Sequence, residues 1–290
     1  MRLLPALLKY RGGSDDFERM GRGIEERFIR CKKWWEPHLE CSRNFIQRHL
    51  RESKCIGVLG AGRLLDLDLE LLLARCEAVH LYDADAGSVA WWQRAAGAHY
   101  GKRVFGHIQD CTSTMEGWSA ELRRYSARDD LSDFLMACRA PIPDWSHNWF
   151  DGVISLNLLG QIPLYWRDRV LQVKPTLSES EWGALSCSMA ELQQRHIEGV
   201  LTQPQAWSIL ITDTEYYFYH SDESMWRVEP ALFGKVSQEL HDSFVTQGIS
   251  NAWLWHLAPQ YIECDDEGEI HRVEAFFRSP MQSVDTTKDR

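Results

Sequence analysis

Apolar residues follow two alternating patterns along most of this chain. Short apolar runs occupy residues 55–59, 78–82, 104–108, 150–156 and 207–212, and each is followed by a stretch in which helical segments are expected. Strands that alternate with helices in this way pair in parallel, with helices on both faces of the sheet. The last two runs, 252–257 and 269–278, are joined by a short acidic loop, which predicts an antiparallel hairpin. The pattern therefore predicts an α/β fold.

Helical spacing is clearest near the N-terminus, where apolar residues recur at three- and four-residue steps across 24–50. We expect an amphipathic helical segment there, bent near Pro37. Ser178 and Glu181 have capping-box spacing and open part of a long helical region. Pro230 has a favourable first-turn position in the last expected helix. The helices expected after the first one cover residues 64–76, 87–99, 115–139, 158–200 and 229–243.

The chain shows no repeat and no interdomain linker, so its length is assigned to one main domain. Its 290 residues exceed the roughly 180–200 of a minimal nucleotide-binding fold. We expect an N-terminal helical extension over 1–52, a Rossmann-like domain over 53–280 and a flexible tail over 281–290. The extension and the insertions 112–149 and 158–205 can reach the carboxyl ends of the strands. These three segments are the expected location of substrate specificity.

Charge and cysteine usage narrow the cellular context and the partners. The 32 basic and 42 acidic residues give a net charge of -10, which disfavours nucleic acid and anionic lipid as partners. No run approaches the ~20 apolar residues of a membrane span, and the start lacks a secretory cleavage pattern, so we predict a cytoplasmic protein. The eight cysteines are scattered without CxxC or zinc spacing. This predicts reduced thiols, with neither disulfides nor a metal site.

Candidate ligand-binding residues follow the first two predicted strands, because open parallel sheets bind ligands at the carboxyl ends of their strands. Gly60-Ala61-Gly62 follows the first strand, where glycine permits a sharp turn and close approach of a ligand to the backbone. Asp83 ends the second strand at the spacing of a ribose-binding carboxylate. The alternatives are a plain tight turn and, for Asp83, a helix N-cap. Asp85 has the same chemistry and ranks below Asp83.

The next strands end in further polar residues. The third ends in Gln109-Asp110-Cys111, where a carboxylate and a backbone amide can pair with an adenine edge. Capping of the following turn by Asp110 is the alternative. The fourth strand ends in Asn157-Leu158 before a sharp exit into a helix. All these ends are expected to face one crevice.

In this order, with DGVIS on the fourth run and ILITD on the fifth, the motifs resemble the class I S-adenosylmethionine (SAM)-dependent methyltransferases over residues 53–278. The resemblance implies a seven-stranded Rossmann-like sheet with strand order 3-2-1-4-5-7-6 and an antiparallel last strand. It implies SAM as cofactor, with the glycines at its methionine part, Asp83 at its ribose, and Asp110 and Cys111 at its adenine. The implied cofactor-binding residues are Gly60, Ala61, Gly62, Asp83, Asp110, Cys111, Asn157 and Leu158.

Three departures from the family pattern bear on the site. Val58 stands where members commonly carry an acidic residue, so its role toward the cofactor's amino group is absent or passes to Asp66 or to the N-terminal segment. Leu64 replaces the third glycine of the usual GxGxG. The fourth strand lacks the Asn-Pro-Pro-aromatic signature, which makes exocyclic base amines and glutamine side chains unlikely acceptors.

Catalytic residues do not follow from the cofactor motif, because methyl transfer mainly requires alignment of the acceptor and exclusion of water. The candidates in segments that can cover the crevice are Trp35, His38 and Tyr216, with core packing as the alternative for each. Trp145, His147 and Trp149 form a third ambiguous aromatic group. Trp91 and Trp92 are expected to pack in the core. His196 is expected at the surface.

The sequence therefore predicts a SAM-dependent methyltransferase acting on a small molecule or a protein side chain. The alternatives are a non-catalytic scaffold with the same fold, favoured by Val58 and Leu64, and a nicotinamide-dependent oxidoreductase, which Asp83 would also serve.

Overall fold

The computed structural model describes residues 14–139, 149–201, 206–220, 225–245 and 249–280. All the described strands join one sheet with the order β3-β2-β1-β4-β5-β8-β7, and β6 pairs with β5 beside this path. The strands are β1 (Ser53–Leu59), β2 (Cys76–Asp83), β3 (Val104–Ile108), β4 (Gly152–Leu156), β5 (Trp207–His220), β6 (Met225–Pro230), β7 (Ile249–Ala258) and β8 (Glu267–Arg278). The first five pair in parallel, while β8 is antiparallel to both β5 and β7.

The predicted α/β fold and strand order are confirmed, with one strand more than expected. Pro230 ends β6, and the helix expected from 229 begins only at Val236. β5 is also longer than its apolar run, because the aromatic residues 216–219 continue it to His220. The part of β5 beyond the apolar run pairs with β6 on one side and with β8 on the other.

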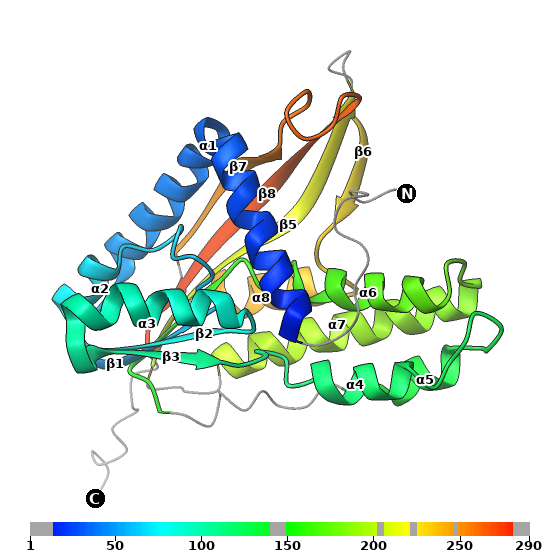
Figure 1. The fold of residues 1–290 in the computed structure, drawn as a ribbon, viewed down its shortest axis with the longest axis horizontal. Helices are drawn as coiled ribbons and strands as arrows, with labels where there is room; N and C mark the ends of the chain where they lie inside the picture. Colours follow the sequence, from blue (N-terminus) through cyan, green and yellow to red (C-terminus); the bar gives the residue numbers. More distant parts are fainter. Residues whose placement is uncertain (1–13, 140–148, 202–205, 221–224, 246–248, 281–290) are drawn as a thin grey trace, which may run out of the picture.

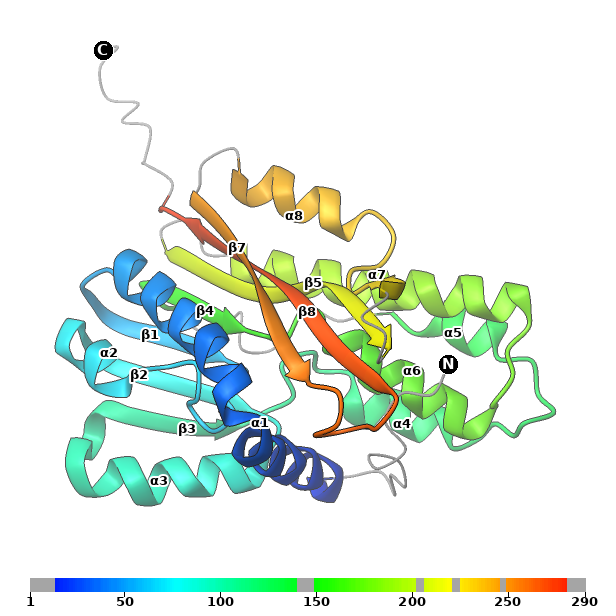
Figure 2. The ribbon, with the colours of Figure 1, turned by 90° about the horizontal axis from the view of Figure 1, so that it is seen from above.

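Helices cover both faces of the sheet, as predicted (Figure 2). The α-helices are α1 (Ser14–His49), α2 (Leu69–Arg75), α3 (Ala86–Tyr100), α4 (Met115–Leu122), α5 (Ser132–Ala137), α6 (Ile162–Val173), α7 (Glu179–Leu201) and α8 (Val236–Val245). The long α1 contains Pro37 and changes direction in both ribbon views. None of the helices described is long and apolar enough to cross a bilayer.

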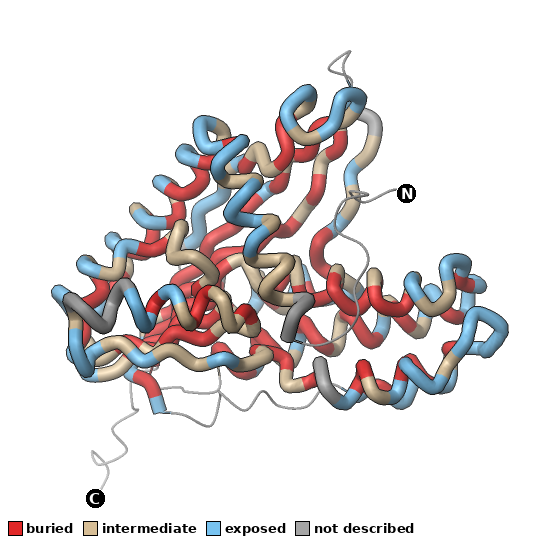
Figure 3. Tube along the Cα trace, viewed as in Figure 1, coloured by how far each residue is buried: buried red, intermediate tan, exposed pale blue. Residues whose placement is uncertain are grey.

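Alternate residues of the central strands enter two different cores. Ile154 and Ile209 point toward the α1 and α3 side, whereas Val153 and Leu210 point toward α7 and α8. This alternation follows from the two-residue period of a strand. Buried positions accordingly dominate the middle of the sheet in Figure 3. All eight cysteines are free thiols in the structure.

Helices α4 to α7 form a helical arm that extends beyond the sheet (Figure 1). The arm has its own apolar core, which includes Trp118, Trp166 and Leu185. The capping box at its α7 end is confirmed: the Ser178 amide donates to Glu181 Oε2 at 2.9 Å, and the Glu181 amide donates back to Ser178 Oγ at 3.3 Å.

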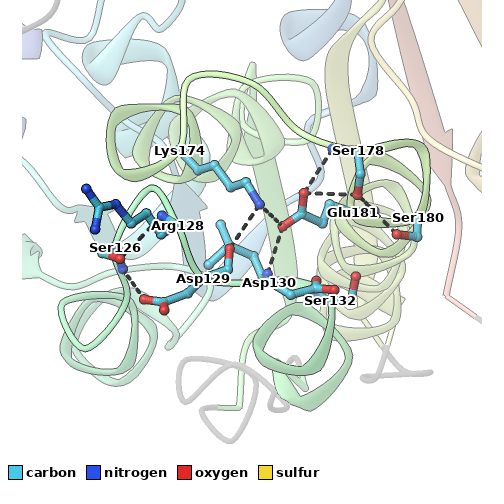
Figure 4. A network of polar contacts seen from close by, with 10 residues as sticks. Ser126, Arg128, Asp129, Asp130, Ser132, Lys174, Ser178, Ser180 and Glu181 are labelled. Carbon is cyan, nitrogen blue, oxygen red and sulfur yellow. Dashed lines mark hydrogen bonds and ion pairs between the residues drawn. The ribbon is translucent and has the colours of Figure 1, made fainter.

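The Glu181 carboxylate also joins the arm's connections (Figure 4). It accepts hydrogen bonds from the Leu131 amide, at 2.8 Å, and from Lys174 Nζ, at 2.8 Å. These bonds, with those of Ser178, hold the pKa of Glu181 at about 2 against the opposing effect of burial. A single carboxylate thus ties the entry of α5 to the start of α7.

His196 contradicts its expected place at the surface. It is 1% exposed, and its Nε2 lies 2.8 Å from Ser155 Oγ on β4. α7 packs against α5 and α6 as well as against the sheet, so more than one side of this helix is buried. Burial lowers the pKa of His196 to about 4.

Candidate functional site

The turn after β1 and the loop after β4 meet at the carboxyl ends of the strands. Gly60 and Gly62 adopt left-handed φ values of 69° and 49°, and the Gly60 amide donates to the Tyr82 carbonyl at 3.0 Å. A Cβ on Gly60 would lie 2.5 Å from Cγ of Leu158 and 2.7 Å from the Leu156 carbonyl oxygen. Both its conformation and this close approach require glycine at position 60.

Asp83 is bonded to the glycine turn. Its Oδ2 accepts the Gly62 amide at 2.8 Å and its Oδ1 accepts the Asp85 amide at 2.8 Å. Burial nevertheless raises the pKa of Asp83. The N-cap of α3 is Asp85, which accepts the Gly87 amide at 2.8 Å, so the capping alternative for Asp83 is wrong. Each Asp83 oxygen keeps a further lone pair for a ligand hydroxyl.

Asp110 caps the turn that leads to α4. Its Oδ1 accepts the Thr112 amide and hydroxyl, at 2.8 and 2.7 Å, and its Oδ2 accepts the Thr114 amide at 2.8 Å. The capping interpretation therefore describes this side chain in the structure. Neighbouring Cys111 is buried, and burial together with the Asp83 and Asp110 charges raises the pKa of its thiol well above the usual value.

Leu64 has a backbone conformation that suits glycine. Its φ is 57°, in the left-handed region that glycine favours and leucine rarely adopts. Its side chain packs against the apolar core on the α1 side. Asn157, directly after β4, has a similar φ of 51°. Unusual backbone conformations thus occur in both loops that form the crevice.

His38, Asp66 and Asn157 connect α1 with these two loops. His38 Nδ1 accepts the Trp253 indole N–H at 3.0 Å, so Nε2 carries the proton, and this nitrogen lies 3.0 Å from Asp66 Oδ1. Burial opposes ionisation of Asp66, but His38 and the bonds from Ser42 and Asn157 outweigh it and lower the pKa of Asp66. Val58, where the resemblance leads one to expect an acidic residue, is buried in the core, and the Asp66 carboxylate follows eight positions later in the chain.

The first half of α1 lies across the carboxyl ends of the strands, where the crevice is expected. Phe17 stacks on Tyr165 of α6, with ring centroids 5.3 Å apart. A Cβ on Gly21 would lie 2.2 Å from Asp85 Oδ2, at the start of α3. Farther along, Trp35 donates to the Leu257 carbonyl at 2.9 Å. The helix therefore contacts both walls of the crevice before it packs on β7.

Sequence reasoning missed a second polar cluster, formed by Asp213 of β5 with Glu269 and His271 of β8. Asp213 Oδ2 lies 3.2 Å from His271 Nδ1, and Glu269 Oε1 lies 2.9 Å from His271 Nε2. Burial alone would lower the pKa of His271, but the two carboxylates raise it to about 9. The signal was the placement of Glu269 and His271 two residues apart, on one face of the last strand.

Tyr216, a predicted candidate, belongs to the same cluster. It lies within β5 rather than after it, and its ring centroid is 4.4 Å from that of His271. Its hydroxyl donates to the Gly160 carbonyl at 3.0 Å. Burial, together with the Asp213 and Glu269 charges, raises the pKa of Tyr216 well above its usual value. The hydroxyl is therefore a neutral donor that holds the loop after β4.

The remaining aromatic candidates do not converge on the crevice. Trp92 is buried as expected, whereas Trp91 is 39% exposed. Trp145 and His147 lie outside the described residues. Trp149 is 83% exposed and, with His80 and His107, lines a cavity of about 350 Å³ on the other side of the sheet. A second cavity, of about 500 Å³, lies beside Ser53 at the amino end of β1.

The strand order defines the class of fold. β8 and β7 correspond to strands seven and six of the expected order, so the chain has a Rossmann-like sheet in the order that the resemblance to class I SAM-dependent methyltransferases implies, with β6 added. No protein-family profile matches the sequence. A search of curated proteins also finds no match.

Solved structures with a similar fold include three methyltransferases. Magnesium protoporphyrin IX methyltransferase ChlM from Synechocystis PCC 6803, with bound SAH, is 12% identical, with a TM-score of 0.44 over 92% of this chain and 98% of that chain. An rRNA methylase from Streptococcus thermophilus is 11% identical, with a TM-score of 0.38 over 83% and 96%. N-methyltransferase NodS from Bradyrhizobium japonicum is 8% identical, with a TM-score of 0.34 over 84% and 93%. At these identities the likeness concerns the fold alone.

Proposed function

We propose that the protein is a SAM-dependent methyltransferase whose acceptor is a small molecule or a protein side chain. The observation that carries the proposal is the bond from the Gly62 amide to Asp83, at the carboxyl ends of β1 and β2 in this strand order. It places a carboxylate with free lone pairs beside a glycine turn, which suits a ribose next to a close-packed ligand.

The cofactor-binding assignment follows the same loops. Gly60, Ala61 and Gly62 would form the floor, and Asp83 would accept the ribose hydroxyls. Asn157 Oδ1 is buried without a hydrogen-bond partner among the described residues, so it offers an acceptor to a ligand. Cys111 would contribute through its backbone, because its thiol is neutral and Asp110 is occupied by its turn. Leu158 would pack beside the methyl-bearing end.

Asp66 is the proposed partner of the cofactor's amino group. Its pKa is lowered, so it is ionised at neutral pH, and its side chain is 19% exposed. When bound, SAM supplies an electrophilic methyl group. The protein then has to orient the acceptor and exclude water, for which α1 lies across the crevice between Tyr165 and Asp85.

Ligand-induced stabilisation tests the proposal. S-adenosylhomocysteine at a hundred-fold excess over Kd is expected to raise the melting temperature by about 5 °C or more. Asp83→Asn should lose most of this shift, because a neutral amide accepts ribose hydroxyls more weakly. Asp68→Asn is the matched control, since Asp68 caps α2 through the Leu71 amide at 3.1 Å and lies outside the proposed site.

The outcomes separate the alternatives. Absence of a shift in the wild type at millimolar ligand would contradict the proposal. A shift with NADH in its place would favour the oxidoreductase. The scaffold hypothesis is favoured by one observation, the packing of α1 across the crevice. Tight S-adenosylhomocysteine binding without methyl transfer to any acceptor class would support it.

A further inference from the structure

The cluster of Asp213, His271 and Glu269 has an unbalanced charge. The pKa of His271 is raised to about 9 and that of Glu269 is lowered, so at neutral pH one imidazolium lies between two carboxylates. Two of the flanking guanidinium groups contact other carboxylates: Arg27 shares Glu263, at 3.1 Å, with Arg30, at 2.7 Å, and Arg167 contacts Asp168 at 3.4 Å. Arg227, on the Glu269 side, contacts Glu229 at 3.1 Å.

Four buried polar atoms at this cluster lack hydrogen-bond partners among the described residues: both oxygens of Asp213, Nδ1 of His271 and Nε1 of Trp255. Asp213 Oδ2 and His271 Nδ1 face each other as an ion pair at 3.2 Å, which leaves Asp213 Oδ1 and Trp255 Nε1. Asp213 is 0% exposed, and its Oδ1 accepts no hydrogen bond. Trp255 is 5% exposed, and its Nε1 donates none. A buried polar atom without a partner costs roughly 1–3 kcal/mol, and more when it is charged. Such atoms in one place point to a ligand that supplies the missing partners.

The loop that reaches the proposed methyl position packs directly on this cluster. The Asn157 amide donates to the Ile211 carbonyl at 2.8 Å, and the Gly160 amide donates to Thr212 Oγ1 at 3.0 Å. A Cβ on Gly160 would lie 3.0 Å from Cβ of Asp213. Asp213 therefore lies against the loop that begins with Asn157 and Leu158.

Aromatic rings border the same place. Trp255 is directly opposite His271 in the β7–β8 register, with ring centroids 5.6 Å apart, and Tyr216 is opposite it in the β5–β8 register. Trp35 of α1 packs edge-on against Trp255 at 4.9 Å. Trp255 also stacks on His38, with ring centroids 4.1 Å apart. Negative charge bordered by aromatic rings favours a cation.

We propose that this cluster is the acceptor-binding site and that the acceptor is a protonated amine. The inference rests on the proposed methyltransferase function. Asp213 Oδ1 would bind the ammonium group, and Glu269 would add to the negative field. His271, held by both carboxylates, is a positioning residue that keeps Asp213 oriented toward the loop.

The same arrangement accounts for the proton that must leave before transfer. One ammonium proton passes to Asp213 Oδ1, which frees the nitrogen lone pair. That pair forms the new N–C bond to the methyl carbon, while the electron pair of the broken S–C bond stays on sulfur. The products are an N-methylammonium ion and S-adenosylhomocysteine, and Asp213 afterwards loses its proton to water.

The test compares an amine, an alcohol and a carboxylate that share one carbon skeleton. The first series is 2-phenylethylamine, 2-phenylethanol and phenylacetate, and two further series carry an indolylethyl or a butyl group instead. Binding to the full chain is measured by calorimetry with saturating S-adenosylhomocysteine. In at least one series we expect the amine to bind about ten-fold or more tightly than the alcohol, with no binding of the carboxylate.

Variants assign the preference to the cluster. Asp213→Asn should remove the amine preference while leaving S-adenosylhomocysteine affinity unchanged. Glu269→Gln should reduce the amine preference several-fold. Because Glu269 is less buried than Asp213, this variant replaces Asp213→Asn in the test if Asp213→Asn does not fold. Glu215→Gln is the control, because Glu215 lies on β5 outside the cluster and bonds to Tyr217. Equal binding of amine and alcohol in every series, or a preference unchanged in both cluster variants, overturns the inference.

Failure of the two proposals is distinguishable. If S-adenosylhomocysteine does not bind the wild type, the methyltransferase function fails. Amine selectivity lost in Asp213→Asn would then still support an amine site at the cluster. If S-adenosylhomocysteine binds and is released on turnover of alcohols or thiols only, the function stands and the amine inference is overturned.

Discussion

The helical arm and the crevice each contain a buried carboxylate, but the two carboxylates have different surroundings. Glu181 in the arm is 1% exposed, and both its oxygens accept hydrogen bonds, from Leu131, Lys174 and Ser178. Asp213 in the crevice is 0% exposed, and its Oδ1 has no partner in the described part of the chain. In the arm, the buried carboxylate of Glu181 holds the start of α5 to the start of α7. In the crevice, one oxygen of the buried Asp213 carboxylate has no hydrogen-bond partner within the ranges that the structure describes.

Backbone conformation separates the two regions in the same way. Leu64 and Asn157, both in crevice loops, have left-handed φ values of 57° and 51°. The capping box of α7 instead satisfies the first amides of that helix with ordinary geometry. Ser132 Oγ in α5 is also buried without a partner among the described residues, so the difference between the regions lies in the backbone strain and in the Asp213 carboxylate. Such strain is common at functional sites, which supports the proposed ligand site at the crevice.

The largest expected effect is the loss of the Glu181 carboxylate. Glu181→Ala leaves the Leu131 amide, the Ser178 amide and the Lys174 ammonium without their acceptor. Because the carboxylate is buried, we expect the free energy of unfolding to fall by about 3 kcal/mol. Urea denaturation measures this loss. Glu179→Ala, at an exposed position in the same helical turn, is the control and should change stability by less than about 0.5 kcal/mol. Equal losses would remove the structural role assigned to Glu181.

The two regions should lose stability at opposite ends of the pH scale. The folded pKa of His271, about 9, lies above its ordinary value of 6.5, so its contribution is fully present below 6.5 and disappears as pH rises through 9. The folded pKa of Glu181, about 2, lies below 4.5, so its contribution is present above 4.5 and disappears as pH falls through 2.

Thermal unfolding between pH 6 and 10 measures the loss of stability at high pH, here called the basic limb. We expect the wild type to lose up to about 3 kcal/mol between pH 6.5 and 9.5 through His271. His271→Gln should flatten this limb and leave the acid limb unchanged. Glu181→Gln should reduce the acid limb only. A basic limb that persists in His271→Gln would show that the imidazolium is not held by its two carboxylates.

The sequence predicted the fold well because the apolar runs of β1, β4 and β5 are buried on both faces, which is a strong local signal. It missed β6 because Pro230 suits a helix start and a strand end equally well. It placed His196 at the surface because the pattern of α7 does not show how many neighbours the helix packs against. Those neighbours come from α5 and α6, which are distant in sequence.

The site was predicted as far as it depends on residues that follow single strands. Gly60, Gly62 and Asp83 meet because β1 and β2 are adjacent parallel strands. The Asp213 cluster depends on the antiparallel register that places His271 opposite Tyr216, with a bulge between Asp213 and Glu215. Neither the register nor the bulge can be derived from residue spacing in one strand. His38 was named as a candidate, but its bond to Asp66 depends on how α1 packs.

The smallest expected effect concerns the strained backbone of the crevice, at Leu64. Leu64→Gly and Leu64→Ala both remove the partly buried side chain, but only glycine adopts a φ of 57° without steric cost. The glycine variant should therefore be more stable than the alanine variant by about 1 kcal/mol, the reverse of the order at an ordinary position. Urea denaturation of the two variants measures the difference. Ala184 in α7 of the arm provides the control, because Ala184→Gly should destabilise by about 1 kcal/mol in regular helix. Opposite signs at the two sites would confirm that backbone strain belongs to the crevice and not to the arm, and equal signs would contradict it.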